Sequence, residues 1–248
     1  MSDSHSRSGR AVSVIIPAIN EEESLPLVLA DLPWDRLHEV IVVDNGSTDA
    51  TVEVAKAGGA RVVHEPRRGY GSACLAGIAA LSPECEIVVF LDGDYSDHPD
   101  ELPKVIAPIE EGRAAMVIGS RTTGGAEPGA LLPQARFGNA LAVFLLRLFF
   151  RQRYTDLGPF RAIGRRELDA IGMVDTNFGW TVEMQIKVAR AGLPIAEVPV
   201  SYRKRIGQSK ITGTVRGTIG AGYKILWTIF RYGFAPRPEV EPSPSSSS

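Results

Sequence analysis

The sequence predicts an α/β fold in which a mostly parallel central sheet carries helices on both faces, followed by a C-terminal amphipathic helix. Short β-branched and apolar runs alternate with helix-like segments, the pattern of parallel strands joined by crossover helices. One run, residues 87–91, is apolar at every position, as expected of a strand buried on both faces. A polar loop follows each early strand, and because the carboxyl ends of parallel strands share one edge, we expect these loops to face one crevice.

The first half of the chain shows strand, polar loop and helix in repetition. Glutamates at 21–23 stand where a helix would begin and complement its dipole, so helix capping is one interpretation of them. The loop at 65–73 opens a helix of small residues that ends at Ala80. Strands are expected at 12–17, 39–43, 61–64 and 87–91, with helices of about ten residues after Ser24 and of seven residues at 51–57.

In the second half of the chain, the sequence predicts that strands and helices continue to alternate. The glycine-rich loop at 122–132 suggests a mobile cover for a substrate. The apolar helix at 137–150 is bracketed by arginines, which suits a membrane or oligomer interface as well as ordinary burial. We expect helices at 100–111 and 178–191, strands at 115–119 and 196–202, and a short strand that ends at Ile163.

Composition fits one large domain with an appendage. The chain has 248 residues and 44% hydrophobic content, enough for a sizeable core. Cys74 and Cys85 lack the spacing of a disulfide scaffold or zinc site, so a reducing compartment is expected. The ends at 1–10 and 236–248 are predicted to be disordered tails. The sequence contains no run of about 18 uncharged apolar residues, so no transmembrane helix is predicted.

The formal net charge of −2 hides an asymmetry between the two halves. Residues 1–135 hold 10 Lys and Arg against 21 Asp and Glu, and residues 136–237 hold 17 against 6. The halves therefore carry about −11 and +11, and the basic half indicates an anionic partner. Its cations are not interleaved with aromatic residues as in single-strand binders, which favours a membrane surface or a phosphorylated substrate over nucleic acid.

Two carboxylates, Asp92 and Asp94, follow the apolar run at 87–91 and are separated by Gly93. In extended chain residues two apart point to the same side, so the carboxylates are expected to converge beyond the end of a central strand. Carboxylates held that close favour a hard divalent cation between them. The same residues also suit an ordinary polar turn, since Asp-Gly is a common turn dipeptide.

Other strand ends carry groups suited to a nucleotide. Asp44 follows the second strand and suits a base or ribose, and Arg68 with the amides near Gly69 and Gly71 suits phosphates. The glycines lack both the P-loop spacing and the Gly-x-Gly-x-x-Gly pattern, which counts against a P-loop enzyme or a dinucleotide dehydrogenase. Arg121 closes the strand at 115–119, on the same edge, where it suits a phosphate or is an ordinary surface arginine.

The basic loop at 203–210 holds four cations in eight residues and predicts an anion site. Glu183, near the start of the helix at 178–191, suits helix capping, or a general base if the substrate were a hydroxyl. His64 and His98 have no partner at metal-ligand spacing and are taken as structural residues.

Six motifs occur in the order found in the family 2 glycosyltransferases of the GT-A (Rossmann-like) fold, and the resemblance covers about residues 11–213. The sequence looks closest to the dolichyl- and polyprenyl-phosphate mannosyl- and glucosyltransferases. The motifs are Pro17-Ala18-Ile19-Asn20-Glu21, Val42-Val43-Asp44-Asn45-Gly46-Ser47, Arg68-Gly69-Tyr70-Gly71, Asp92-Gly93-Asp94, Gly119-Ser120-Arg121 and Gly207-Gln208-Ser209-Lys210.

The resemblance implies roles for individual residues. Asp92 and Asp94 match the Asp-x-Asp motif that binds Mg²⁺ or Mn²⁺ across the donor diphosphate, and Arg121 matches an arginine near the donor and acceptor phosphates. The late basic loop resembles an Arg-x-x-Gly-x-Ser-Lys acceptor-phosphate site, but Lys204 stands in place of the arginine. We expect Arg205 and Lys210 to contact phosphate, with the choice among Arg203, Lys204 and Arg205 open. The nucleoside would contact Pro17, Ile19, Glu21, Val42 and Asp44.

The implied activity is an inverting, metal-dependent transfer of a sugar from a nucleotide diphosphate sugar to a polyprenyl phosphate. Residues 11–213 would form the catalytic domain, and the amphipathic helix at 214–235 would lie on the membrane, which places the enzyme peripherally on its cytoplasmic face. The Gln-x-x-Arg-Trp signature of processive synthases is absent. Alternatives are a soluble relative that uses a hydroxyl acceptor through Glu183, a sugar-phosphate nucleotidyltransferase, and a non-catalytic membrane scaffold. Oligomerisation stays open.

Overall fold

A computed structural model describes residues 9–207 and 215–236. Within these residues one sheet has seven strands in the order β3-β2-β1-β4-β6-β5-β7. Its strands are β1 (Val12–Ala18), β2 (Glu39–Asp44), β3 (Arg61–His64), β4 (Ile87–Phe90), β5 (Met116–Ser120), β6 (Arg161–Gly164) and β7 (Ile195–Pro199).

The sheet is parallel except at one strand, β6, which runs antiparallel to both β4 and β5. The remaining pairs, including β1 with β2 and β1 with β4, are parallel. The predicted mostly parallel sheet is therefore confirmed. The carboxyl ends of β1, β2, β4 and β5 lie at one edge, where the polar loops were expected to face one crevice.

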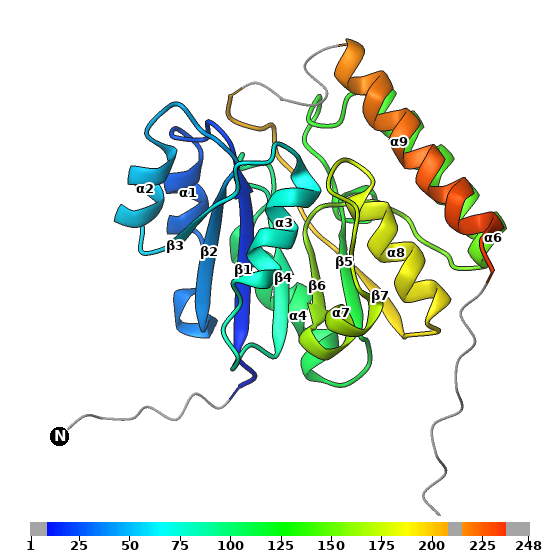
Figure 1. Cartoon of the computed structure of the whole chain (residues 1–248), viewed down its shortest axis with the longest axis horizontal. Helices are drawn as coiled ribbons and strands as arrows, with labels where there is room; N and C mark the ends of the chain where they lie inside the picture. Colours follow the sequence, from blue (N-terminus) through cyan, green and yellow to red (C-terminus); the bar gives the residue numbers. More distant parts are fainter. Residues whose placement is uncertain (1–8, 208–214, 237–248) are drawn as a thin grey trace, which may run out of the picture.

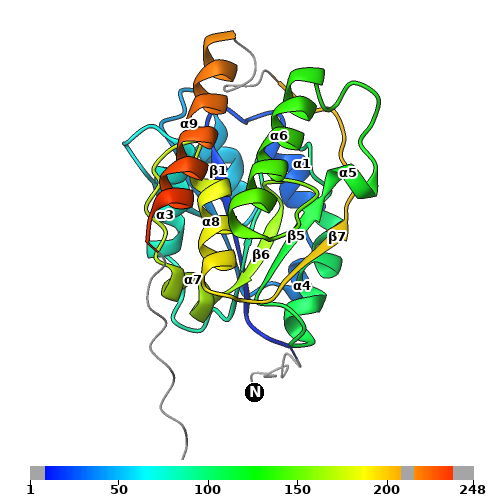
Figure 2. The ribbon, with the colours of Figure 1, turned by 90° about the vertical axis from the view of Figure 1, so that its right-hand side faces the viewer.

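Helices cover both faces of the sheet, as Figures 1 and 2 show. The helix α1 (Leu25–Ala30), with α2 and α4, packs on one face, and α3, α7 and α8 pack on the other. The helices after α1 are α2 (Thr51–Ala57), α3 (Tyr70–Ala79), α4 (Leu102–Glu110), α5 (Arg121–Gly124), α6 (Pro133–Phe150), α7 (Arg165–Ile171), α8 (Trp180–Arg190) and α9 (Val215–Phe234), with short 3₁₀ turns at Trp34–Arg36 and Pro99–Glu101.

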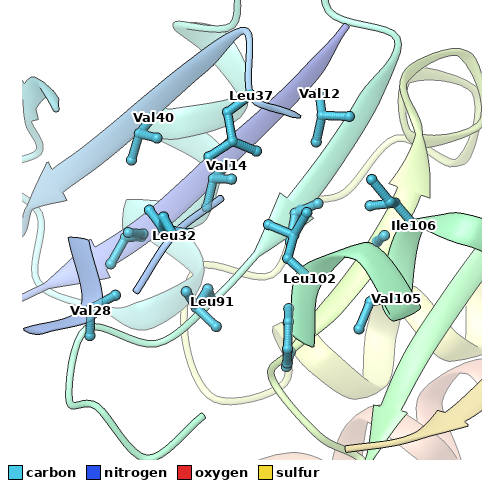
Figure 3. Close-up of a cluster of buried hydrophobic side chains, with 14 of the residues drawn as sticks. Val12, Val14, Val28, Leu32, Leu37, Val40, Leu91, Leu102, Val105 and Ile106 are labelled. Carbon is cyan, nitrogen blue, oxygen red and sulfur yellow. The ribbon is translucent and has the colours of Figure 1, made fainter. Parts of the chain in front are cut away.

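Two hydrophobic cores result from the alternation of side chains along the central strands. In β1, Val12, Val14 and Ile16 point to the α1 and α4 face, while Ile15 points to the other. Figure 3 shows Val12 and Val14 beside residues of α1 and α4, Leu102 and Ile106 among them. Because both faces are covered, every residue of β4 is buried, which explains why this run is apolar throughout.

The second core is built around Trp180 at the start of α8. Its ring meets the ring of Phe90 edge to face at a centroid distance of 4.6 Å and that of Tyr70 at 6.0 Å. These contacts join β4, α3 and α8 directly beneath the carboxyl edge of the sheet. These three aromatic rings therefore pack beneath the carboxyl edge of the sheet and support it.

Several elements differ in extent from the sequence expectation. The first helix has six residues instead of about ten, and Glu21, Glu22 and Glu23 precede it, so they do not cap its first turn. The expected loop at 122–132 begins within the short helix α5. The helix expected at 137–150 begins four residues earlier, since Pro133 suits a first helical turn. The helix α7 follows β6 at once and was not predicted.

The last described helix, α9, packs along α6 and α8 on one side of the molecule (Figure 2). Phe149 of α6 contacts Phe230 and Phe234 of α9 at ring-centroid distances of 5.5 Å, so the carboxyl ends of both helices meet. Within the described ranges, no helix has the length and apolar character needed to cross a membrane. Of the tails predicted at 1–10 and 236–248, residues 1–8 and 237–248 lie outside the described residues, as do residue 214 and Lys210.

Candidate active site

A cavity of about 340 Å³ opens at the carboxyl ends of β1 and β4. Predicted residues from four separate loops line it. They are Pro17, Ile19, Glu21, Arg68, Asp92, Gly93, Asp94 and Arg205, joined by Asn45, Tyr70, Asn177 and Phe178, which were not assigned a site role from the sequence.

Asp92 and Asp94 both face this cavity, although β4 ends at Phe90 and the chain turns directly afterwards. Asp92 Oδ1 accepts a hydrogen bond of 3.1 Å from the hydroxyl of Tyr70, the first residue of α3. Burial raises the pKa of Asp92, while Arg205 and Tyr70 oppose the rise. The carboxylate is thus held in a desolvated place where a positive charge stabilises it.

Asp94 is bonded on both carboxylate oxygens. Oδ1 accepts hydrogen bonds from the backbone N–H of Ser96 at 2.9 Å and from its hydroxyl at 2.5 Å. Oδ2 forms an ion pair with the guanidinium of Arg205. This pair brings the acidic turn and the late basic loop, more than a hundred residues apart in sequence, to one place.

The backbone of the basic loop is fixed to the acidic turn. The N–H of Arg203 donates to Ser96 O at 2.9 Å, and the N–H of Ile206 donates to Asp94 O at 3.0 Å. The Arg203 guanidinium lies 3.4 Å from the ring centroid of Tyr95 and donates to Tyr95 O at 2.8 Å, so it supports the turn. Of the three cations at 203–205, Arg205 alone lines the cavity among the described residues. Lys204 lies beside Gly129 in the loop after α5.

Asp44, the last residue of β2, is buried and is not among the described residues that line the cavity. Its Oδ1 accepts a bond of 2.8 Å from Ser47 N–H, and its Oδ2 lies 3.1 Å from Nδ1 of His64. Burial opposes ionisation of Asp44, but bonds from Ser47 and His64 outweigh it and lower the pKa. His64 is therefore the partner of Asp44. Val42, also predicted to contact the nucleoside, lies fully buried in the first core.

Asn45 organises the loop that carries Arg68. Its Nδ2 donates to the carbonyls of Glu65 at 2.9 Å and Arg67 at 2.8 Å, and its Oδ1 accepts from Gly69 N–H at 2.8 Å. These three bonds fix the loop at the mouth of the cavity. The sequence shows Asn45 only as part of a turn, and its long-range partners have no local signal.

The glycines of this loop allow a second segment to approach. A Cβ at Gly71 would lie 2.1 Å from Asp175 O, and one at Gly69 would lie 2.3 Å from Thr176 O. The backbone N–H of Ser72 donates to Thr176 O at 2.9 Å. The segment after α7 is thereby placed against the start of α3, which explains how Asn177 and Phe178 reach the cavity.

Arg121 lies at the end of β5, held by the buried carboxylate of Asp156. Its Nε and Nη2 donate to Asp156 at 2.8 and 2.7 Å in a bidentate pair, and its guanidinium lies 5.0 Å from the Tyr202 ring centroid. Burial acts to lower the pKa of Arg121, but Asp156 outweighs it and raises the pKa. Arg121 also helps to oppose the rise in the pKa of Asp92.

Arg121 borders a second cavity of about 630 Å³ along α6. Its walls include apolar side chains of α6, such as Val143 and Phe144, together with the cations Arg136 and Arg147. An apolar groove with arginines suits a ligand that joins an anionic group to a hydrocarbon chain.

A divalent cation fits the first cavity only with help from a ligand. Among the described residues, no group of three or more His, Cys, Asp or Glu side chains is arranged to hold a metal ion. Asp92 and Asp94 supply two hard oxygen donors, which is the usual protein share for Mg²⁺ when phosphate oxygens and water complete the octahedron. The donor chemistry thus fits a metal that arrives with a diphosphate.

Comparison with known proteins agrees with this geometry. Residues 13–172 match the model of glycosyl transferase family 2. An uncharacterised glycosyltransferase of Mycobacterium tuberculosis is 42% identical over 86% of this chain and 94% of its own. A dolichyl-phosphate hexose transferase of Haloferax volcanii is 37% identical over 81% and 86%, and an undecaprenyl-phosphate mannosyltransferase of Micrococcus luteus is 31% identical over 91% and 95%.

A solved structure shares the fold. Glucosyl-3-phosphoglycerate synthase of Mycobacterium tuberculosis, in complex with Mn²⁺, UDP and phosphoglyceric acid, superposes with a TM-score of 0.74 at 26% identity. The match covers 92% of this chain and 80% of that one. From the family match, the relatives and this shared fold, the chain belongs to glycosyl transferase family 2 and is a glycosyltransferase of the GT-A fold.

Proposed function

We propose that this glycosyltransferase moves a hexose from a UDP- or GDP-linked donor to a polyprenyl phosphate, with inversion at the anomeric carbon. The observation that carries the proposal is the position of Arg121. It borders the apolar, arginine-lined groove along α6 and follows β5, whose carboxyl end lies at the same edge of the sheet as the turn with Asp92 and Asp94. A donor diphosphate and a lipid phosphate could therefore meet beside one guanidinium.

On the donor side, the nucleotide diphosphate occupies the first cavity. Asp92 and Asp94 would hold Mg²⁺ or Mn²⁺, which stabilises negative charge on the departing diphosphate. Arg205 lies at the same carboxylates and adds a positive charge there. Arg68 lines the same cavity and is proposed to contact the remaining phosphate oxygens, whereas Gly71 is not among the described residues that line it. The complex of the related synthase with Mn²⁺ and UDP supports this assignment.

On the acceptor side, the lipid phosphate lies near Arg121 and its hydrocarbon chain follows the groove along α6. A phosphate monoester has a second pKa of about 6 and is largely dianionic at neutral pH, so it attacks without a general base. Its oxygen forms the new bond to the anomeric carbon as the bond to the nucleotide diphosphate breaks, and the diphosphate leaves with the electron pair. Lys204 and Lys210 of the basic loop are proposed to add charge for the phosphates.

The environment of Glu183 favours this acceptor over a hydroxyl. Both of its carboxylate oxygens are bonded to the backbone of 174–175, Lys187 and Tyr232. The residue is buried and is not among the residues that line the first cavity in the described chain. It is therefore badly placed to take a proton from a hydroxyl acceptor.

The outer face of α6 and α9 is proposed to rest on the cytoplasmic side of a membrane. Large apolar side chains are exposed there, with Phe144 at 60%, Leu148 at 62% and Phe234 at 77% of full exposure. Cations on the same helices, Arg147 and Arg231 among them, suit anionic headgroups. The groove along α6 would then open toward the lipid that supplies the acceptor.

The test is a panel of labelled UDP- and GDP-sugars offered to the full chain with polyprenyl phosphate, with and without chelator. We expect label in the organic phase from one donor, lost with chelator and lost in Asp92→Asn. Phosphoglyceric acid serves as a water-soluble acceptor, because the related synthase was solved with it. Label on that acceptor alone, or organic label that persists in excess chelator, would contradict the proposal.

A further inference from the structure

Glu183 of α8 joins three parts of the molecule through one buried carboxylate, 1% exposed. Its Oε2 accepts hydrogen bonds from the backbone N–H groups of Val174 at 3.2 Å and Asp175 at 2.7 Å. Its Oε1 accepts from the hydroxyl of Tyr232 at 2.7 Å and lies 2.9 Å from Nζ of Lys187. Tyr232 belongs to α9, so the carboxylate links α9 to the segment at 174–178.

A second set of contacts joins the same two parts. Lys224 Nζ of α9 lies 3.0 Å from Asp175 Oδ2. A Cβ at Gly179 would lie 2.6 Å from Thr228 Oγ1, so the chain after Asp175 runs directly against α9. The inner face of α9 therefore combines core residues such as Ile229 with polar groups bonded to this segment, while its outer face carries exposed aromatic residues such as Tyr223.

The other side of the segment forms a wall of the first cavity. Asn177 and Phe178 line it, and the carbonyl of Thr176 accepts the N–H of Ser72 at 2.9 Å. The carbonyl of Asp175 touches the start of α3 at Gly71, beside the tyrosine that donates to Asp92. A shift of the segment would move both the wall and the loop placed for phosphate.

We propose that Glu183 is a positioning residue for the nucleotide-sugar donor, through which α9 holds the donor cavity in its binding shape. The contacts run without a gap from Tyr232 and Lys224, through Glu183 and Asp175, to Asn177 and Phe178. Glu183 itself touches no substrate. The inference rests on the proposed function, since it takes the first cavity to be the donor site.

The experiment uses Tyr232→Phe, which removes one hydroxyl, and Glu183→Gln, which keeps the size of the side chain. Binding of UDP and of GDP, each with Mn²⁺, is measured by calorimetry on the full chain, and donor and acceptor KM are measured separately. Both variants should weaken binding of the nucleotide and raise donor KM by about fivefold or more, with acceptor KM unchanged. Tyr223→Phe, the same change on the outer face of α9, should leave both unchanged.

A double-mutant cycle separates positioning from general destabilisation. If Tyr232 acts through Glu183, adding Tyr232→Phe to Glu183→Gln should weaken nucleotide binding little further. Wild-type affinity in both single variants, or equal rises in donor and acceptor KM, would overturn the inference while the proposed function stands. A wild-type chain that binds neither nucleotide would overturn both.

Discussion

Three consecutive cations, Arg203, Lys204 and Arg205, differ in what their side chains contact. Arg203 supports the turn through Tyr95, Lys204 lies at Gly129, and Arg205 reaches Asp94 in the cavity. In extended chain neighbouring side chains point in opposite directions and residues two apart point to the same side, so Arg203 and Arg205 both face the acidic turn while Lys204 faces away from it. The sequence alone could not separate them, because the distinction depends on backbone bonds to residues 94 and 96.

Arg205→Gln should therefore reduce sugar transfer by about tenfold or more, because a positive charge beside the proposed diphosphate site is lost. Lys204→Gln should cause a smaller loss, since its side chain lies away from this cavity. Initial rates at saturating acceptor compare the two, and Arg113→Gln, an exposed arginine paired with Glu111, serves as the control. A larger loss for Lys204→Gln would contradict the assignment.

Asp97 is a buried carboxyl whose two oxygens have no hydrogen-bond partner among the described residues. Burial and the nearby Asp92 raise its pKa to about 7. Because the pKa in the folded state exceeds the unfolded value near 3.8, Asp97 contributes stability that is full below pH 4 and is lost as the pH rises through 7.

For metal-free protein, the free energy of unfolding should fall by up to about 3 kcal/mol between pH 5 and pH 8 through Asp97 alone. Asp97→Asn removes this titration, so its stability should depend less on pH over that window. Urea unfolding in chelator at both pH values measures the difference between the two proteins. Parallel pH dependence would show that Asp97 does not titrate there.

At the scale of elements, the site depends on how closely α3 and the segment after α7 approach. Gly71→Ala would place a methyl group 2.1 Å from Asp175 O, so the two backbones must separate. We expect a loss of about 1–3 kcal/mol in stability, as for other overpacked sites, together with weaker UDP binding. Urea unfolding and calorimetry measure both.

Gly138→Ala is the matched control, since a Cβ there would meet nothing within 4 Å and the residue lies inside α6. The change should stabilise the protein by up to about 1 kcal/mol through helix propensity, with UDP binding unchanged. Equal effects of the two substitutions would mean that the close approach at Gly71 has no special role.

The elements that the sequence predicted best are those with strong apolar patterns. The strand at 87–91 and the helix at 137–150 are long or uniform enough to be recognised from their own residues. The helix α7 is short and polar and was missed, and the direction of β6 depends on its partners β4 and β5. Asp92 and Tyr70 both belong to sequence motifs, but only the carboxylate indicates its role by its chemistry. Asn177 belongs to no motif and reaches the cavity through contacts of its segment with the start of α3, more than a hundred residues away in sequence.

At the scale of the whole molecule, the charge asymmetry is reflected in the charged residues that line the two cavities. The acidic half supplies Asp92 and Asp94, and the basic half supplies the arginines along α6 and the late loop. The outer face of α6 and α9 combines cations with exposed aromatic side chains on one side of the molecule. This distribution is what a surface helix needs to bind anionic lipid.

The full chain should float with vesicles that contain anionic lipid, and less so as the salt concentration rises. Replacing Phe144 and Leu148 with glutamate should abolish flotation, because both side chains are exposed on α6. Leu27→Glu changes an exposed leucine of α1, on the opposite side of the sheet, and should float like the wild type. Equal flotation of all three proteins would remove α6 from the proposed lipid contact.

The ion pair with Arg205 gives Asp94, in the first cavity, a counter-ion from the protein itself. Since Ile206 and Arg203 fix this loop to the acidic turn, the guanidinium stays within reach of the carboxylate. Any divalent cation must compete with the Arg205 guanidinium for Asp94. Metal affinity is therefore set by the difference between the attraction of the carboxylate to the metal ion and its attraction to the guanidinium. Removing the competitor should tighten the binding of Mn²⁺ while it slows transfer, which makes Arg205 a residue that trades cation affinity for turnover.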